Sequence, residues 1–281
     1  MSTQQPSLLR RAAGPDADGL VMGIDPASAG WEWVTFHAWR LAPGMAVTRA
    51  ADDQERLVLV LEGHARVRAG DRDLGTVGSR ASVFDRIPAP VVVVEPGLPV
   101  EVVATSPAFV AIAAAPGGTV RRTALVGPDA IRVETRGSGS TERTIHHLLP
   151  PGGDHAGRLI AFEAYTPGGH WSSYPPHKHD TEDPPREARL EELYYFRFAK
   201  PQGFAFARVY TQDRGLDETM TPTDGDLVLV PDGYHPVGVP AGYDCWFLNV
   251  MAGPRREWLF TLDPDHAWLM DWSPAAPQAA T

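Results

Sequence analysis

Short runs of β-branched and aromatic residues, separated by glycine and proline, make up most of this 281-residue chain. Many short apolar runs with a turn signal about every ten residues are typical of β-sandwiches and β-barrels. Helical periodicity is scarce, since only residues 187–192 have the character of a single helical turn. We therefore expect an all-β protein with little helix. The runs occupy residues 31–41, 57–61, 91–94, 100–104, 109–114, 159–165, 193–198, 204–210, 227–230 and 246–251.

The segment 136–141, Arg-Gly-Ser-Gly-Ser-Thr, has the composition of a linker and divides the chain into halves of similar length. We expect a first domain over residues 1–135 and a second over residues 136–281, each with enough strands for a small barrel. Both halves contain a glycine turn, an apolar run and then a proline, and this shared pattern suggests an internal duplication. The two domains are therefore predicted to be tandem β-barrels.

Charge, hydropathy and cysteine content limit the kinds of partner and the cellular location that we expect. The chain has 35 acids and 25 bases, a net charge of −10, which argues against a nucleic-acid partner because phosphate binding needs a cationic face. No apolar run reaches membrane-spanning length, so no membrane partner is expected. Cys245 is the only cysteine, so no intramolecular disulfide can form. The segment after Arg10 and Arg11 lacks the apolar core of an export signal, which predicts a cytoplasmic protein.

The two halves differ in chemistry, because only the second has residues at metal-ligand spacing. His177 and His179 lie two residues apart, so on an extended strand both imidazoles point to the same side. Glu192 stands at the head of the next strand-like run, and His235 follows in a turn containing proline and glycine. Three imidazoles and one carboxylate suit a divalent transition metal; Zn²⁺ is the first choice, and Mn²⁺ and Fe²⁺ accept the same ligands. The first half is expected to be a scaffold domain without a metal site.

Two adjacent glutamates compete for the carboxylate position, and strand parity distinguishes them. Side chains alternate between the two faces of a strand, so Glu192 shares a face with Tyr194, Phe196 and Phe198. That set has the character of a barrel interior with a ligand at its rim. Glu191 belongs to the opposite face, and we therefore expect Glu192 to bind the metal.

The histidine pair with a following glutamate, and the later glycine-rich turn with His235, resemble the two cupin motifs. Twelve residues separate His179 from Glu192, more than is usual in cupins. The segments 171–180, 191–198, 231–237 and 249–254 resemble the 5-deoxy-glucuronate isomerase family of inositol catabolism, which is related to the 4-deoxy-5-ketouronate isomerases of pectin breakdown. This resemblance implies a bicupin fold of jelly-roll type. It also implies an aldose–ketose isomerase that converts 5-deoxy-D-glucuronate, a small-molecule substrate, to 5-dehydro-2-deoxy-D-gluconate.

Further candidates for the site come from strand faces and from the neighbours of the proposed ligands. The guanidinium of Arg208 stands at the end of an otherwise apolar strand face, where a substrate carboxylate would compensate its charge. Glu163 and Tyr165 share a strand face and are weak candidates for proton transfer. The residues that flank ligand positions are weak candidates for substrate contacts: Tyr174, Lys178, Tyr234 and Asn249.

Several alternatives stay open at the level of sequence. A metal-assisted enediol route and a hydride shift both move a carbonyl from C1 to C2. A cupin oxygenase that uses Fe²⁺ and O₂ has much the same metal ligands, and an isomerase of a related deoxy-ketouronate would share the chemistry. Aromatic strands such as residues 31–36 favour a homo-oligomer, because exposed strand edges pair readily.

Overall fold

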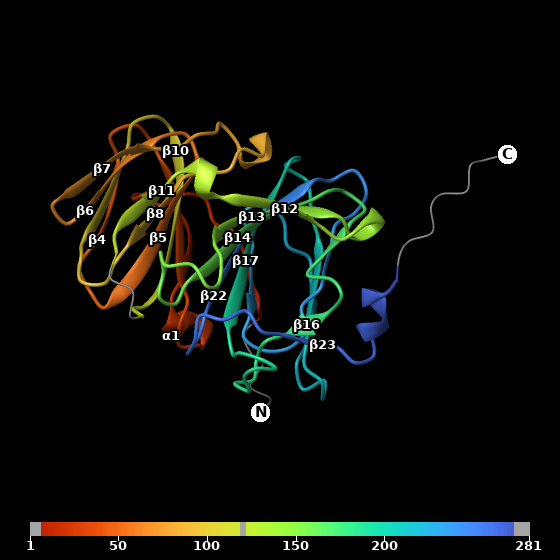
Figure 1. The fold of residues 1–281 in the computed structure, drawn as a ribbon. Helices are drawn as coiled ribbons and strands as arrows, with labels where there is room; N and C mark the ends of the chain where they lie inside the picture. Colours follow the sequence, from red (N-terminus) through yellow and green to blue (C-terminus); the bar gives the residue numbers. More distant parts are fainter. Residues whose placement is uncertain (1–6, 119–121, 273–281) are drawn as a thin grey trace, which may run out of the picture.

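The computed structural model describes residues 7–118 and 122–272, and it consists of two β-sandwiches lying side by side (Figure 1). All of its paired strands are antiparallel, and the helices are single turns: α1 (Pro26–Ala29), η1 (Val83–Asp85), η2 (Pro128–Ala130), η3 (Gly139–Thr141) and η4 (Ala267–Met270). The all-β class expected from the short apolar runs is therefore confirmed.

The first sandwich pairs a six-stranded sheet with a four-stranded sheet. The six-stranded sheet has the order β11 (Ala124–Val126), β8 (Val91–Val94), β5 (Gln54–Glu62), β10 (Ala108–Pro116), β3 (Thr35–Leu41), β2 (Leu20–Ile24). The four-stranded sheet has the order β4 (Ala46–Arg49), β9 (Val100–Ala104), β6 (Ala65–Ala69), β7 (Arg72–Val77).

The second sandwich pairs a seven-stranded sheet with two smaller sheets. The seven-stranded sheet has the order β1 (Leu9–Arg10), β20 (Leu227–Val230), β17 (Glu191–Phe198), β22 (Cys245–Ala252), β14 (Ile160–Thr166), β13 (Arg143–Leu149), β12 (Arg132–Arg136). Facing it are β15 (Trp171–Ser172), β21 (Val237–Gly238), β18 (Phe206–Tyr210), β19 (Asp217–Met220), and the pair β16 (His177–Lys178) and β23 (Thr261–Leu262).

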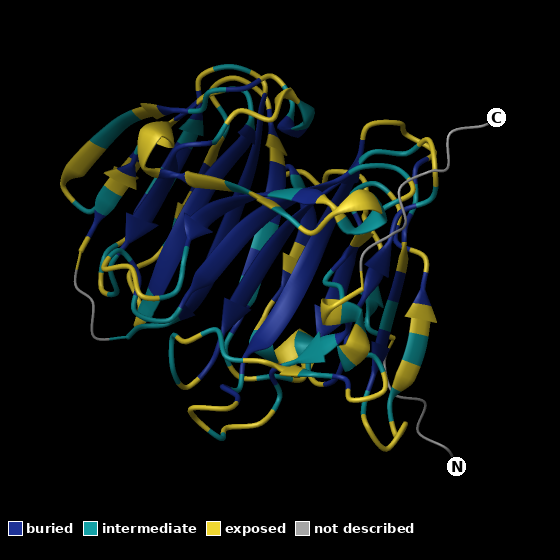
Figure 2. Ribbon diagram, turned by 45° about the vertical axis from the view of Figure 1, so that its right-hand side comes forward, coloured by how far each residue is buried: buried dark blue, intermediate teal, exposed yellow. Residues whose placement is uncertain are grey.

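The two large sheets pack against each other, so their strands are buried on both faces. On β5, Leu57, Leu59 and Leu61 belong to the core between the two sandwiches, while Val58 and Val60 belong to the core of the first sandwich. A strand covered on both sides has no polar face, which explains why the central runs are continuously apolar in sequence. Figure 2 shows these central strands as buried, with exposed residues gathered in loops and on the outer sheets.

Two strands from the first half of the chain join the second sandwich. β1 pairs with β20 through Leu9 and Val228, and β12 pairs with β13 from Arg132 onward. The expected domain division after residue 135 falls within β12, and the expected linker 136–141 contains the end of β12 and η3. The second sandwich thus draws strands from both sides of that division.

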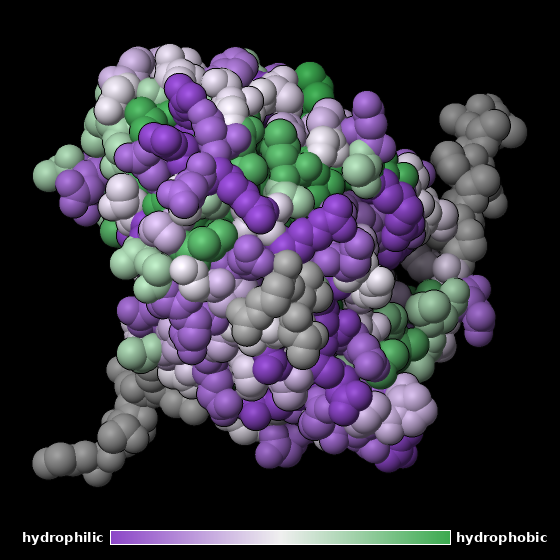
Figure 3. Space-filling model, turned by 60° about the vertical axis from the view of Figure 1, so that its left-hand side comes forward, coloured by the Kyte–Doolittle hydropathy of each residue, from purple (hydrophilic) through white to green (hydrophobic). Residues whose placement is uncertain are grey.

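On the face shown in Figure 3, hydrophobic atoms form separate patches among hydrophilic ones. Across the described residues the exposed large apolar side chains include Trp171, Phe206 and Trp268. No helix in the described part of the chain is long and apolar enough to cross a membrane.

Candidate metal centre and adjoining cavity

Three imidazoles and one carboxylate meet inside the second sandwich. The Oε2 atom of Glu192 on β17 lies 2.7 Å from Nε2 of His179 and 3.1 Å from Nε2 of His235. The ring of His177 on β16 lies 4.9 Å from that of His235, centroid to centroid. The side chains of His179, Glu192 and His235 are buried, and their candidate ligand atoms all lie within 4.8 Å of one another.

Backbone carbonyls fix the orientation of all three imidazoles. Nδ1 of His177 donates to the carbonyl oxygen of Pro175 at 3.1 Å, and Nδ1 of His179 donates to that of Leu190 at 3.0 Å. Nδ1 of His235 donates to the carbonyl oxygen of residue 233 at 2.8 Å. In a neutral ring with Nδ1 protonated, Nε2 carries a lone pair, so at His179 and His235 lone pairs face a carboxylate oxygen. Atoms held this close share either a proton or a metal cation, and the convergence of oriented imidazoles on a carboxylate fits a transition metal.

Electrostatics indicate an ionised carboxylate beside the imidazoles. Burial alone would lower the pKa of His179, but its hydrogen bond and attraction to Glu192 raise that pKa. Burial, reinforced by the neighbouring imidazoles, lowers the pKa of His177 to about 3, so its ring is neutral at neutral pH. Burial alone would raise the pKa of Glu192, but His235 and His179 hold that pKa well below its usual range. The Nδ2 group of Asn249 on β22 donates to the other oxygen of Glu192, Oε1. The carboxylate is therefore ionised and fixed on both oxygens.

The parity argument is supported by the opposite placement of the two adjacent glutamates. Glu192 faces the interior of the second sandwich, whereas Glu191 faces the first sandwich. There, Glu191 accepts hydrogen bonds from the backbone N–H groups of Glu32 at 2.6 Å, Trp33 at 2.7 Å and Val34 at 3.2 Å. Three backbone donors explain how a carboxylate is accommodated between the two sandwiches. Glu191 therefore joins the two sandwiches and does not face the imidazoles.

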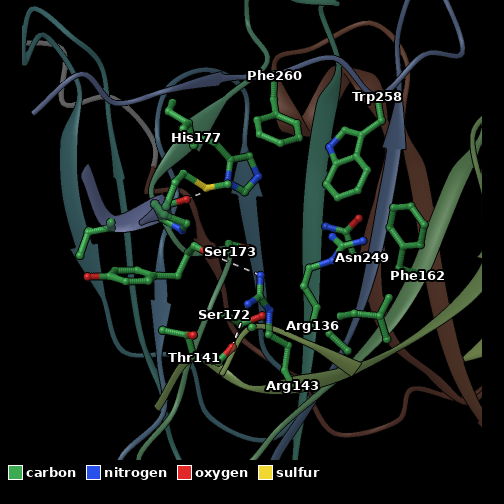
Figure 4. A pocket seen from close by; sticks show the side chains of 18 of the residues that line it. Arg136, Thr141, Arg143, Phe162, Ser172, Ser173, His177, Asn249, Trp258 and Phe260 are labelled. Atoms are coloured by element: carbon green, nitrogen blue, oxygen red, sulfur yellow. Dashed lines mark hydrogen bonds between the residues drawn. The ribbon is translucent and has the colours of Figure 1, made fainter. Parts of the chain in front are cut away.

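A cavity of about 470 Å³ opens beside the imidazole cluster. Figure 4 shows His177, Asn249 and the aromatic rings of Phe162, Trp258 and Phe260 around it. Titratable and polar side chains therefore occupy part of a wall that is otherwise mainly apolar. The remaining lining residues come from strands β13, β14, β17 and β22 of the large sheet, from the end of β12 and the turn after it, from the segment before β16 and from the C-terminal segment: Arg136, Gly137, Ser138, Thr141, Arg143, Ile145, Ala164, Ser172, Ser173, Tyr174, Pro175, Glu192, Tyr194, Phe247, Leu262, Leu269, Met270 and Trp272.

Arg208 was expected to bind the substrate carboxylate, but it lies outside the cavity. Its guanidinium donates two hydrogen bonds to Asp217, at 2.8 and 2.6 Å, and does not line the cavity. The inward face of its strand is formed by Ala205, Ala207 and Val209, which belong to the core of the second sandwich. Alternation put Arg208 on one face with Phe206, as expected, but at both positions the side chain is exposed.

Glu163 and Tyr165 also lie away from the cavity, on the face of β14 that packs against the first sandwich. Glu163 is fully buried and forms an ion pair with Arg80, and the guanidinium of Arg80 donates to Tyr165 Oη at 3.1 Å. Nδ1 of His146 lies 3.3 Å from Glu163 Oε2. The expectation that either residue transfers protons is therefore corrected, because both belong to a buried polar cluster between the sandwiches.

The remaining candidates divide into two groups. Tyr174 and Asn249 line the cavity. Lys178 forms ion pairs with Asp180 and Glu187, and Tyr234 donates from its hydroxyl to Gln212 at 2.7 Å; neither lines the cavity.

Cationic residues at the far end of the cavity were missed by the sequence reasoning. Arg136 ends β12 and Arg143 begins β13, and the two are direct cross-strand partners. Arg143 is followed by a strand with polar and apolar residues, and its local sequence contains no signal that it faces a cavity. The aromatic pair Trp258 and Phe260 was also missed, and its spacing of two residues was the available signal.

The chain is similar over most of its length to proteins of known name and known structure. The 5-deoxy-glucuronate isomerase of Geobacillus thermodenitrificans is 44% identical over 264 residues, covering 94% of this chain and 96% of that protein. The protein of the same name from Bacillus subtilis is 41% identical over 252 residues, covering 90% and 93%. The crystal structure of an IolB-like protein from Salmonella typhimurium has a TM-score of 0.91 at 42% identity, covering 94% of this chain and all (100%) of that one.

A more distant likeness concerns the fold alone. The oxalate decarboxylase of Lactobacillus farciminis has a TM-score of 0.63 at 15% identity and covers 96% of this chain and 92% of that one. Together with the tandem sandwiches, it identifies the fold as bicupin. The sequence model of the KduI/IolB family matches residues 8–269, and the chain belongs to that family.

Proposed function

We propose that the protein is an aldose–ketose isomerase that converts 5-deoxy-D-glucuronate to 5-dehydro-2-deoxy-D-gluconate with the help of a divalent metal. The observation that carries this proposal is the orientation of the imidazoles. Their Nδ1 groups donate to backbone carbonyls, and the Nε2 atoms of His179 and His235 converge on Oε2 of Glu192. The names of the relatives, at 41–44% identity over most of the chain, support the substrate.

His177, His179, Glu192 and His235 would hold the cation, and Zn²⁺, Mn²⁺ and Fe²⁺ all suit three nitrogens and one oxygen. Such an ion supplies Lewis-acid polarisation of a carbonyl and a template for adjacent substrate oxygens. The relatives' name implies a place in inositol catabolism, and a cytoplasmic location stays a prediction, as does a homo-oligomer.

The protein's own side chains orient the substrate and exclude water. Asn249 holds Glu192 so that one carboxylate oxygen is directed at the imidazoles. The hydroxyl of Tyr194 lies 2.7 Å from Ser173 Oγ, and both residues line the cavity, so this pair offers hydrogen bonds to substrate hydroxyls. The rings of Phe162, Trp258 and Phe260 shield the wall from water, which strengthens polar contacts inside the cavity.

A coupled assay with purified, metal-loaded protein tests the proposal. The protein should isomerise 5-deoxy-D-glucuronate without consuming O₂ and should prefer it over 4-deoxy-5-ketouronate, the rival that the KduI part of the family name suggests. His177→Ala should abolish turnover and retained metal together. Turnover of the ketouronate alone, or O₂ uptake that tracks turnover, would contradict the proposal. Retention of a C2 deuteron in the product would select the hydride shift, and exchange with solvent the enediol.

A further inference from the structure

Arg143 is a buried cation without a carboxylate partner among the described residues. Only 7% of the residue is exposed, and its guanidinium lines the cavity. Its guanidinium donates hydrogen bonds to two backbone carbonyls, from Nη1 to Thr141 at 2.8 Å and from Nη2 to Tyr174 at 3.4 Å. Carbonyls orient the group but do not neutralise it, and a buried charge is costly unless an anion accompanies it.

A second arginine, Arg136, lies beside Arg143 and has a carboxylate partner of its own. Arg136 lies directly opposite Arg143 on the paired strand, an arrangement that is destabilising for like charges. Arg136 is compensated by Glu134, to which it donates two hydrogen bonds of 3.2 Å, and its guanidinium lies 5.2 Å from the ring centre of Trp258. Burial, with a further contribution from Arg136, lowers the pKa of Arg143 to about 10, so the group remains charged at neutral pH.

The backbone around Arg143 leaves room for a guanidinium. Gly137 has a φ of +81°, and a Cβ atom there would lie 2.8 Å from Nη1 of Arg143 and would collide with the carbonyl oxygen of Thr141. Figure 4 shows Arg143 held between Thr141 and the segment of Ser173, on the side of the cavity away from His177 and Phe260. The cavity therefore has a metal-ligating end and a cationic end.

We propose that Arg143, with Arg136 beside it, binds the carboxylate of the substrate and so determines which end of the uronate meets the imidazole cluster. A planar guanidinium binds a carboxylate through two parallel hydrogen bonds, which fixes direction as well as position. With the carboxylate at Arg143, the aldehyde end of the chain is left to lie toward His177. This assignment rests on the proposed function for the identity of the substrate, but the anion site itself rests on the geometry of Arg143.

Binding measured by calorimetry tests the assignment without turnover. The ligand is the substrate reduced to the alcohol at C1, which keeps the carboxylate but cannot isomerise, and its methyl ester is the uncharged counterpart. Wild-type protein should bind the acid more tightly than the ester. Arg143→Gln should weaken binding of the acid by roughly 30-fold or more, the usual scale for truncating one partner of a buried charge pair, with little effect on the ester.

Arg66→Gln, which removes an exposed arginine paired with Asp73 in the first sandwich, is the matched control and should leave both affinities unchanged. Arg143→Lys retains the charge and serves if the glutamine variant does not fold; it should still weaken the acid selectively, because an ammonium lacks the bidentate geometry. Equal binding of acid and ester by the wild type, or equal losses for both in the variants, would overturn the assignment. If the acid binds through Arg143 but 5-deoxyglucuronate is not turned over, the proposed function fails and the anion site stands.

Discussion

The ion pair between Arg80 and Glu163 links the two sandwiches, and removing one partner should destabilise the protein strongly. Both side chains are fully buried. The guanidinium also donates to the carbonyl oxygens of Leu61 at 3.0 Å and Ile87 at 3.2 Å. Arg80→Met therefore leaves the carboxylate of Glu163 buried with only the imidazole of His146 nearby, and an uncompensated buried charge costs about 3–5 kcal/mol.

Urea denaturation of the wild type, Arg80→Met and the double variant Arg80→Met/Glu163→Leu measures this cost. The single variant should lose about 3–5 kcal/mol of unfolding free energy, and the double variant should recover most of the loss, since apolar replacement of a buried pair is often neutral or stabilising. A single variant that loses less than about 1 kcal/mol, the scale of an exposed pair, would refute the reasoning, as would a double variant at least as unstable as the single one.

The pH dependence of the unfolding free energy tests the ion pair between Arg80 and Glu163 independently. Burial would raise the pKa of Glu163, but the charge and hydrogen bonds of Arg80, together with those of His146, outweigh burial and lower the pKa below the ordinary glutamate value. A carboxyl whose pKa is lower in the folded state stabilises the fold above its unfolded pKa, and this stabilisation is lost as the pH falls through the folded pKa. Wild-type stability should therefore fall more steeply under acid conditions than that of the double variant.

Two further predictions concern groups that hold the metal ligands. Asn249→Ala removes the donor to Glu192 and should weaken metal affinity by about 10–100-fold, measured by competition with a chelator; unchanged affinity would contradict a positioning role. Gly233→Ala places a side chain at a φ of +89° against the carbonyl oxygen of Tyr210, in the turn that precedes His235. Thermal unfolding should show a loss of at least about 1–3 kcal/mol, whereas a variant as stable as the wild type would show that the turn relaxes freely.

Strand periodicity was the most informative signal in the sequence. It separated Glu192 from Glu191 because alternation is a property of the backbone that any strand obeys. The spacing of His177 and His179 predicted that both imidazoles face one point. The candidate ligand atoms of His179, Glu192 and His235 lie within 4.8 Å of one another, and the ring of His177 lies 4.9 Å from that of His235.

Strand alternation, which assigned Glu192 correctly, also led to the wrong role for Arg208. Alternation sorts side chains into two faces but does not say which face is inside, and the inward residues Ala205, Ala207 and Val209 are small enough to be overlooked beside Phe206. Arg143 was missed because its importance depends on a cross-strand partner, Arg136, and pairing between strands is not visible in the local pattern. Glu163 was misassigned for a similar reason. Its partner Arg80 lies 83 positions away in the sequence, and the two meet only because the sandwiches pack against each other.

Metal content of matched glutamate variants tests the central claim most directly. Wild-type protein, Glu191→Gln and Glu192→Gln are purified, incubated with Zn²⁺, Mn²⁺ or Fe²⁺, freed of loosely bound ions, and analysed by mass spectrometry of the elements. We predict about one ion per chain in the wild type and in Glu191→Gln, and little or none in Glu192→Gln, because only the carboxylate of Glu192 faces the imidazoles. Full metal content in Glu192→Gln together with its loss in Glu191→Gln, or no bound metal in the wild type, would contradict the account.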